Sequence, residues 1–149
     1  MNYWLLKTEP TSYSILDLKK DVTTSWTGVR NYQARNFIQT MKKGDKFLFY
    51  NSSSATPGVY GVGEISKDAY PDPTAQNKKD YHYDPKSTKE KPIWYAVDVK
   101  FGKIFKEPLT LFHIKQDKDL SHMMVAQKGS RLSVMPVDKE HFDLIIKKV

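Results

Sequence analysis

Glycine residues inside segments that otherwise read as β-strands constrain the fold of this 149-residue chain more than any other feature. Gly61 and Gly63 interrupt the strand-like segment 59–66, and Gly102 interrupts the long segment 93–105. Glycine inside a strand usually marks a bulge, a bend or the close approach of another backbone. These glycines do not form a dinucleotide-binding fingerprint, which must follow a strand and open a helix. They predict a small, curved sheet or barrel.

The remaining segments complete an α+β pattern. Ala34, Phe37, Ile38 and Met41 recur at helical spacing and predict an amphipathic helix that Gly44 closes. Other predicted elements are strands over 3–7, 46–50 and 131–134, a helix over 12–20 capped by Ser12 or Ser14, and helices over 109–117 and 138–148. We therefore predict one α+β domain over residues 1–149, a small curved sheet flanked by short helices.

Composition limits the compartment and the chemistry. The chain has no cysteine, which excludes a disulfide framework, a thiolate zinc site and a cysteine nucleophile. The apolar run near the N-terminus is interrupted by Lys7 and Glu9 and is too short for a signal peptide or a membrane span. We expect a cytoplasmic protein. No coiled-coil pattern is present, so a monomer is expected.

The charge balance favours a polyanionic partner such as nucleic acid. Lysine and arginine outnumber aspartate and glutamate by 24 to 17, and the formal net charge is +7. Only Arg30, Arg35 and Arg131 are arginines, whose planar guanidinium suits phosphates, base edges and aromatic faces. The alternatives are that the lysines form an ordinary solvated surface and that each arginine ties a loop to backbone carbonyls.

The segment "SWTGVRNYQARNF", residues 25–37, is the first candidate binding site. If the helix begins near Asn31, its free N–H groups form an anion site beside Arg30. Trp26 can then present its ring to a planar ligand, and a nucleotide combines such a plane with a negative charge. The alternative is that Trp26 fills the core and Asn31 only caps the helix.

The segment 68–92 shows no periodicity and is the second candidate. Its aromatic and basic residues alternate in a way that suits base stacking beside a phosphate backbone, and they are Tyr70, Lys78, Lys79, Tyr81, Tyr83, Lys86 and Lys89. The tyrosines could equally pin the loop to the sheet.

An enzyme is the competing function class. Its carboxylates would have to come from Glu9, Glu64, Asp98 or the loop acids Asp68, Asp72, Asp80 and Asp84, which could hold Mg²⁺ in pairs. The loop acids are interspersed with lysines and lack ligand spacing, so a solvated loop is predicted. The four histidines are scattered singly, and no serine elbow is present. We predict no catalytic residue, metal or cofactor, and a module that binds a small molecule or a protein in the same pocket stays open.

Motifs along the whole chain resemble those of the EVE domain family. They are, in order, "YWLLKTEP", "YSILDL", "SWTGVRNYQARNF", "GDKFLFYNSS", "PGVYGVGEI", "AYPDPTA", "YDPKS", "WYAVDVKF" and "RLSVMPV". The resemblance implies a PUA-like fold, a small and mostly antiparallel β-barrel related to YTH and ASCH domains. It also implies a non-catalytic reader of modified bases in DNA or RNA, with 5-methylcytosine and 5-hydroxymethylcytosine as the leading ligands.

The resemblance further implies a pocket between the loop before the main helix and the end of the strand over 46–50. Trp26 would be its stacking wall, and the other implied base-binding or nucleic-acid-binding residues are Lys7, Glu9, Val29, Arg30, Asn31, Tyr50, Asn51, Ser52, Ser53, Arg131 and Ser133. Backbone contacts are expected from Arg35, Lys78, Lys79, Tyr81, Tyr83 and Lys86.

Three of these assignments differ from the rest. Many relatives carry histidine where this chain has Asn51, and an amide donates and accepts but cannot titrate. Ligand preference or pH dependence is therefore expected to differ here. Tyr50 and Arg35 have a structural role as their alternative.

Overall fold

The structure is a computed structural model that describes residues 1–128 and 131–149. In this part of the chain six strands form one sheet, and they are β1 (Tyr3–Thr8), β2 (Thr23–Trp26), β3 (Lys46–Asn51), β4 (Gly58–Pro71), β5 (Tyr95–Thr110) and β6 (Val134–Val137). The same residues form the helices α1 (Ile15–Asp21), α2 (Tyr32–Thr40), α3 (Leu111–Gln116) and α4 (Lys139–Lys148), and the 3₁₀ turns η1 (Pro73–Gln76) and η2 (Met124–Ala126). The predicted α+β class is confirmed.

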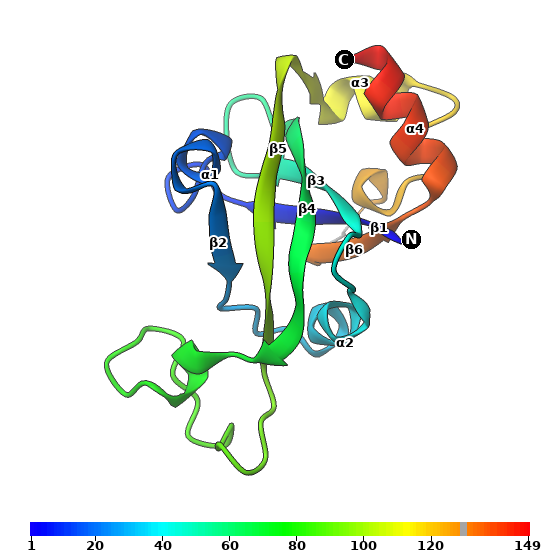
Figure 1. Cartoon of the computed structure of the whole chain (residues 1–149). Helices are drawn as coiled ribbons and strands as arrows, with labels where there is room; N and C mark the ends of the chain where they lie inside the picture. The colour runs from blue at the N-terminus through cyan, green and yellow to red at the C-terminus, as the bar shows by residue number, and fades with distance from the viewer. Residues whose placement is uncertain (129–130) are drawn as a thin grey trace.

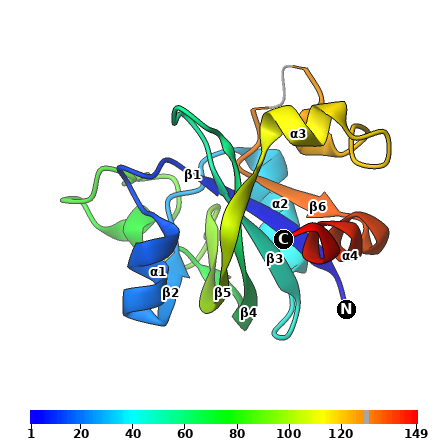
Figure 2. The same ribbon diagram turned by 90° about the horizontal axis from the view of Figure 1, so that it is seen from above.

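The sheet is strongly curved. Its strand order is β2-β5-β4-β3-β1-β6, and only the β1–β3 pair is parallel among the pairs of described strands. The long strands β4 and β5 form a twisted ribbon, and β1 and β6 cross it at a steep angle in both views (Figure 1, Figure 2). The predicted curved and mostly antiparallel sheet is therefore confirmed, and β2 and β6 form its two edges.

The predicted glycine irregularities lie in the β4–β5 ribbon. Pairing shifts between Val62–Lys103 and Gly63–Phe101, which leaves Gly102 as the extra residue of a bulge. A Cβ atom on Gly63 would lie 2.4 Å from the carbonyl oxygen of Lys100 and 2.6 Å from the ring of Phe47. The glycine at position 63 therefore permits close approach of β5 and of a core ring, while Gly102 bends the ribbon.

Two hydrophobic clusters cover the two faces of the sheet. Leu6 and Phe49 face one cluster together with α1 and α2, whereas Leu5 and Leu48 face the other together with α3 and α4. Figure 1 shows α1 and α4 on opposite sides of the β4–β5 ribbon. This alternation follows from the two-residue period of a strand and buries both faces. No helix in the described ranges is long and apolar enough to cross a membrane.

The predicted amphipathic helix is present but shorter than expected. Ala34, Ile38 and Met41 are fully buried, as the spacing predicted. The helix ends at Thr40, because Met41 already has extended backbone angles, and Gly44 does not close it. Gly44, at φ +98°, belongs to the turn that leads into β3.

The main differences from prediction concern strands. β2 was not predicted; it is a four-residue edge strand that pairs only with β5 among the described strands. β4 continues to Pro71, beyond its predicted end at residue 66, and β6 begins only at Val134. Ser14, rather than Ser12, caps α1 by accepting a hydrogen bond from the Asp17 N–H.

The close approach at Gly63 gives a stability prediction. We expect Gly63→Ala to lower the free energy of unfolding by about 1–3 kcal/mol, because the added methyl group displaces the Phe47 ring or the β5 backbone. Urea unfolding followed by tryptophan fluorescence measures this change. Lys103→Ala, an exposed site on the paired strand, is the control. Equal midpoints for the two variants would contradict the proposed crowding.

Candidate functional site

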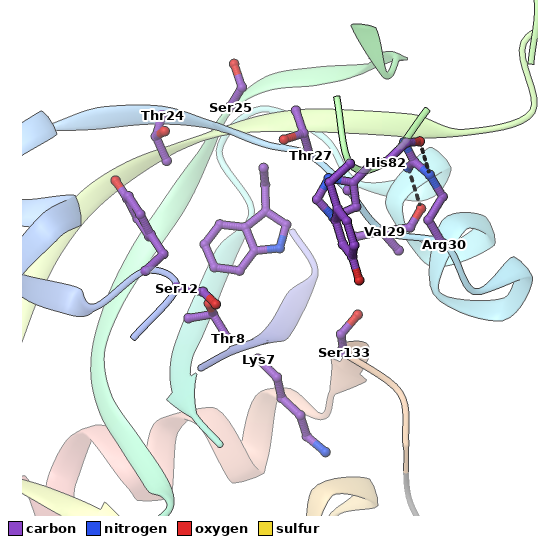
Figure 3. A pocket seen from close by; sticks show the side chains of 14 residues that line it. Lys7, Thr8, Ser12, Thr24, Ser25, Thr27, Val29, Arg30, His82 and Ser133 are labelled. Carbon is purple, nitrogen blue, oxygen red and sulfur yellow. Dashed lines mark hydrogen bonds between the residues drawn. The ribbon is translucent and has the colours of Figure 1, made fainter. Parts of the chain in front are cut away.

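A cavity of about 510 Å³ opens beside β2 and the segment that leads from it into α2. Its wall combines the segment 24–30 with Lys7 and Thr8 at the end of β1, Ser12 and Tyr13 before α1, Tyr81 and His82, and Ser133 before β6. Figure 3 shows Thr27 and Ser133 on different sides of this cavity. Segments far apart in the sequence therefore build one polar and aromatic pocket.

Trp26 belongs both to the core and to the cavity wall. Its side chain is 8 % exposed and packs edge-to-face against Phe49, with ring centroids 5.9 Å apart, and against Tyr13 at 6.3 Å. The part that remains accessible lines the cavity. Trp26 therefore fills the core, as one sequence interpretation proposed, and also borders the cavity, as the other required. Most of its ring surface is buried against other side chains.

A buried ion pair shapes the rim of the cavity. Asp72, whose side chain is fully buried, accepts hydrogen bonds from Arg30 Nη1 at 3.0 Å, from the Gly28 N–H at 2.8 Å and from Thr74. Arg30 also donates from Nε and Nη2 to the carbonyl oxygen of His82, at 3.1 and 2.7 Å (Figure 3). These bonds fasten the segment 28–30 to the segment 72–82.

Hydrogen bonds from three residues lower the pKa of the Asp72 carboxyl. Burial alone would raise its pKa, but hydrogen bonds from Thr74, Gly28 and Arg30 outweigh burial and hold the pKa below its usual value. Arg30 is therefore a structural arginine, as the alternative interpretation proposed, and its guanidinium also lies over the Trp94 ring at 5.4 Å.

Glycine is required at position 28. Gly28 has a φ of +83°, and a Cβ atom there would lie 2.7 Å from Nε2 of His82. The backbone turns here between Trp26 and Arg30, and the His82 ring packs directly against the turn. Any larger residue would push the loop away from the rim.

The segment between β4 and β5 is ordered by its own polar contacts. Asp84 accepts a hydrogen bond from Trp94 Nε1 at 2.7 Å, and Ser87 Oγ accepts one from the Ile93 N–H at 2.8 Å. Tyr70 donates to Asp98 and is a pinning residue, whereas Tyr81 is 94 % exposed. The prediction that the loop acids are all solvated is wrong for Asp72, because it is the buried partner of Arg30.

The predicted site residues do not all meet in one place. Five of them, Lys7, Trp26, Val29, Arg30 and Ser133, line the cavity, and so does Tyr81. Asn31 lies outside it, where its side chain caps α2 by accepting from the Ala34 N–H at 3.0 Å. Asn31 and Arg131 line a separate hollow with Gln33 and Lys128. The structure therefore places Asn31, the N-cap of α2, in a different hollow from Trp26.

The segment 50–53 lies behind the cavity. Tyr50 faces the second core cluster, and Lys7 Nζ lies 5.6 Å from its ring. Asn51 pairs in register with Thr8, and its buried Oδ1 has no hydrogen-bond partner among the described residues. The Ser52 N–H donates to the Thr8 carbonyl at 3.0 Å, and Ser53 is exposed.

The remaining predicted contacts are scattered. Glu9 is exposed just beyond β1, and Lys78, Lys79 and Lys86 are exposed on the long loop, whereas Tyr83 is half-buried. Arg35 donates from Nη1 to the Ile93 carbonyl at 2.9 Å, which supports its structural interpretation. Residues that were not predicted for the cavity are Thr8, Ser12, Tyr13, Thr24, Ser25, Thr27, Gly28 and His82. The hydroxyl-rich string "TTSWT" was the local signal for several of them.

The chemical groups that line the cavity suit ligand binding. Its described lining carries hydroxyl groups, one lysine and aromatic rings, and no carboxylate. Burial lowers the pKa of the Lys7 ammonium. Among the described residues, no group of three histidine, aspartate or glutamate side chains is close enough to hold a metal ion. Such a wall suits a planar, polar ligand that offers hydrogen-bond donors and acceptors.

Comparisons with known proteins identify the family of the chain. The family model described as "EVE domain" matches residues 2–148. Thymocyte nuclear protein 1 of Gallus gallus is 42 % identical, over 97 % of this chain and 67 % of its own length. Among solved structures, a protein from Pseudomonas syringae aligns with a TM-score of 0.94 and 50 % identity, covering 98 % of each chain. Human THYN1, in complex with 5-methylcytosine-containing DNA, aligns with a TM-score of 0.92 and 38 % identity, covering 99 % of this chain and 97 % of its own.

The ion pair predicts a pH-dependent loss of stability. We expect Asp72→Asn to lower the free energy of unfolding by about 1–3 kcal/mol at neutral pH, because Arg30 loses its charged partner in a buried setting. The pKa of Asp72 is lower in the folded chain than in the unfolded chain. The carboxylate therefore stabilises the fold at any pH above the unfolded pKa, and this stabilisation is lost as the pH falls through the folded pKa. The difference from wild type should therefore shrink below about pH 4.

Urea titrations between neutral and acidic pH measure this difference. Asp119→Asn, at an exposed carboxylate, is the matched control. A difference that grows as the pH falls, or equal stability of Asp72→Asn and wild type at neutral pH, would refute the assigned role.

The lowered pKa of Lys7 predicts unusual reactivity. Only the neutral amine is acylated, so the pH at half-maximal labelling should be lower for Lys7 than for the exposed Lys103. Peptide mass spectrometry after brief acylation across a pH series measures both sites in one sample. Coincident pH profiles would show that burial does not affect the ammonium group of Lys7.

Proposed function

Because the chain belongs to the EVE domain family, we propose that it is a non-catalytic module that binds DNA at a modified cytosine and holds that base in the Trp26 cavity. The observation that carries the proposal is a cavity of about 510 Å³ with an aromatic and hydroxyl-bearing wall and no carboxylate among its described lining residues. It is supported by 38 % identity to human THYN1, whose complex contains 5-methylcytosine DNA.

Binding in such a cavity requires a base outside the helical stack. A reader can take the base from a single strand, or extrude it from a duplex at a cost of a few kcal/mol. The cavity then offers hydroxyls of Thr27 and Ser133 to the polar edge of the base and the accessible edge of Trp26 to an added methyl group. One methyl group changes affinity by about 1–3 kcal/mol, so the expected preference is moderate.

A polar side chain is buried behind the lining of the cavity. Asn51 lies beside Thr8 in the β1–β3 pair, and its Oδ1 is buried without a hydrogen-bond partner among the described residues. In the proposal this end of β3 supports the Thr8 side of the pocket from behind, through the β1–β3 pairing of Tyr50 and Asn51 and the hydrogen bond from the Ser52 N–H to the Thr8 carbonyl. An amide in this place makes the support independent of pH.

Charge supplies affinity without base discrimination. The chain carries a formal net charge of +7, and Lys78, Lys79 and Lys86 are exposed on the loop that also carries Tyr81. Arg131 is exposed near the N-terminus of α2, in the hollow that it shares with Asn31. These cations are the proposed phosphate contacts, and their contribution should fall steeply with salt.

Fluorescence anisotropy with matched oligonucleotides tests the proposal. Single-stranded DNA and RNA carrying one cytosine or one 5-methylcytosine are compared at two salt concentrations. We expect methylated DNA to bind about 5- to 150-fold more tightly than unmethylated DNA, at either salt concentration. Trp26→Phe should reduce this preference, because the shorter ring leaves the cavity wall incomplete, while the salt dependence stays.

Trp4→Phe is the matched control, because Trp4 is equally buried but lies outside the cavity lining. It should keep the preference at equal folded fraction, measured by circular dichroism. Equal, salt-sensitive binding to every oligonucleotide would mean that charge alone acts, and tighter binding of the methylated RNA would redirect the proposal to RNA.

A further inference from the structure

A second hollow adjoins the Trp26 cavity. It has a volume of about 560 Å³, and Tyr83, Asp84 and Trp94 are the lining residues that it does not share. The two hollows have Gly28, Arg30, Tyr81 and His82 in common. Tyr81 therefore stands on the boundary between two spaces, either of which can contain a nucleobase.

The Tyr81 side chain is free although its backbone is fastened. The ring is 94 % exposed, and its described aromatic contact is the edge-to-face approach to His82 at 4.8 Å. The next residue is held on both sides, since the His82 N–H donates to Asp80 at 2.8 Å and its carbonyl accepts from Arg30 at 2.7 Å. A solvent-exposed ring on such an anchored segment is preorganised for stacking on a ligand.

The chemistry of the second hollow favours a base over a phosphate. Its carboxylate is that of Asp84, whose pKa is lowered first by the hydrogen bond from Trp94 Nε1 and then by the Lys86 N–H. The cation that also lines the hollow, Arg30, is already paired with Asp72. A negative charge repels a phosphate but accepts hydrogen bonds from the exocyclic amino groups of bases. Tyr83 and the guanidinium plane of Arg30 add flat surfaces to the same hollow.

We propose that the site takes two consecutive nucleotides, with the modified cytosine in the Trp26 cavity and the neighbouring base in the Tyr83–Asp84–Trp94 hollow, stacked on Tyr81. This inference rests on the proposed function and adds to it a residue that contacts the neighbouring base. The two bases are separated by the tyrosine ring, so the preferred ligand is a single strand or a locally opened duplex rather than an intact helix.

Abasic substitution tests the inference directly. Single-stranded DNA with one 5-methylcytosine is prepared with both neighbours intact, with an abasic site on its 5′ side, or with one on its 3′ side. Wild type should lose about 5- to 150-fold in affinity when one particular neighbour is removed, because stacking on that base is lost. Tyr81→Ala should lose a similar factor on the intact strand.

The decisive result is the combination of the two changes. On the strand that lacks the critical neighbour, Tyr81→Ala should bind as wild type does, whereas Tyr81→Phe should match wild type on every strand. Phe112→Ala is the matched control, because Phe112 is a ring of 68 % exposure on α3 and lines neither hollow. It should leave all affinities unchanged.

The outcomes separate the two proposals. Two outcomes overturn the two-nucleotide site and leave the reader function intact, provided that the preference for 5-methylcytosine is present. In the first, the affinity losses from Tyr81→Ala and from removal of the neighbouring base multiply when combined. In the second, Tyr81→Ala causes no loss of affinity. Binding that shows no preference for 5-methylcytosine on the intact strand overturns the proposed function and the two-nucleotide site with it.

Discussion

The hydrogen-bonded ion pair between Arg30 and Asp72 is the interaction on which the rest of the binding face depends. It joins two segments that are 42 positions apart in the sequence, and neither segment is regular secondary structure at the point of contact. Arg30 also donates a hydrogen bond to the carbonyl oxygen of His82, and Asp72 also accepts one from the Gly28 N–H. Because both groups are largely removed from water and well bonded, the pair fixes one loop arrangement instead of adding only surface charge.

The curved sheet supplies the other half of the site. The bulge at Gly102 bends the β4–β5 ribbon, and the glycine at position 63 permits the close approach of β5. The β2 edge strand pairs with β5 where Trp26 meets Val97. Trp26 thus enters the core and still borders the cavity. A wall residue held by Phe49 and Tyr13 loses little conformational entropy when a ligand binds, which is the physical basis for expecting a preorganised pocket.

The sequence predicted the elements with local signals and missed those that depend on distant partners. The spacing of Ala34, Ile38 and Met41 located α2, and glycine inside a strand pattern located the bulge at Gly102. β2 has only four residues, which is too few for a periodic pattern to be distinguished from a loop. Tyr70 and Tyr81 fall in the same segment without sequence periodicity, 68–92, and only the fold shows that Tyr70 belongs to β4 and is bonded to Asp98 while Tyr81 is exposed. No local sequence pattern pairs Arg30 with Asp72. For Asn31 the sequence offered a ligand-binding role and a helix-capping role, and the fold shows the capping hydrogen bond.

The central claim is that the ligand occupies the cavity beside Trp26, and the three tryptophan indole N–H signals in solution NMR test it most directly. Trp4 Nε1 donates to Asp45 at 3.0 Å, and Trp4 does not belong to the cavity lining, whereas Trp26 does. Signals are assigned from Trp→Phe variants and followed while 5-methylcytosine DNA is added. The account predicts that the Trp26 signal shifts in proportion to the bound fraction while the Trp4 signal stays in place. Saturated binding with an unchanged Trp26 signal would contradict it.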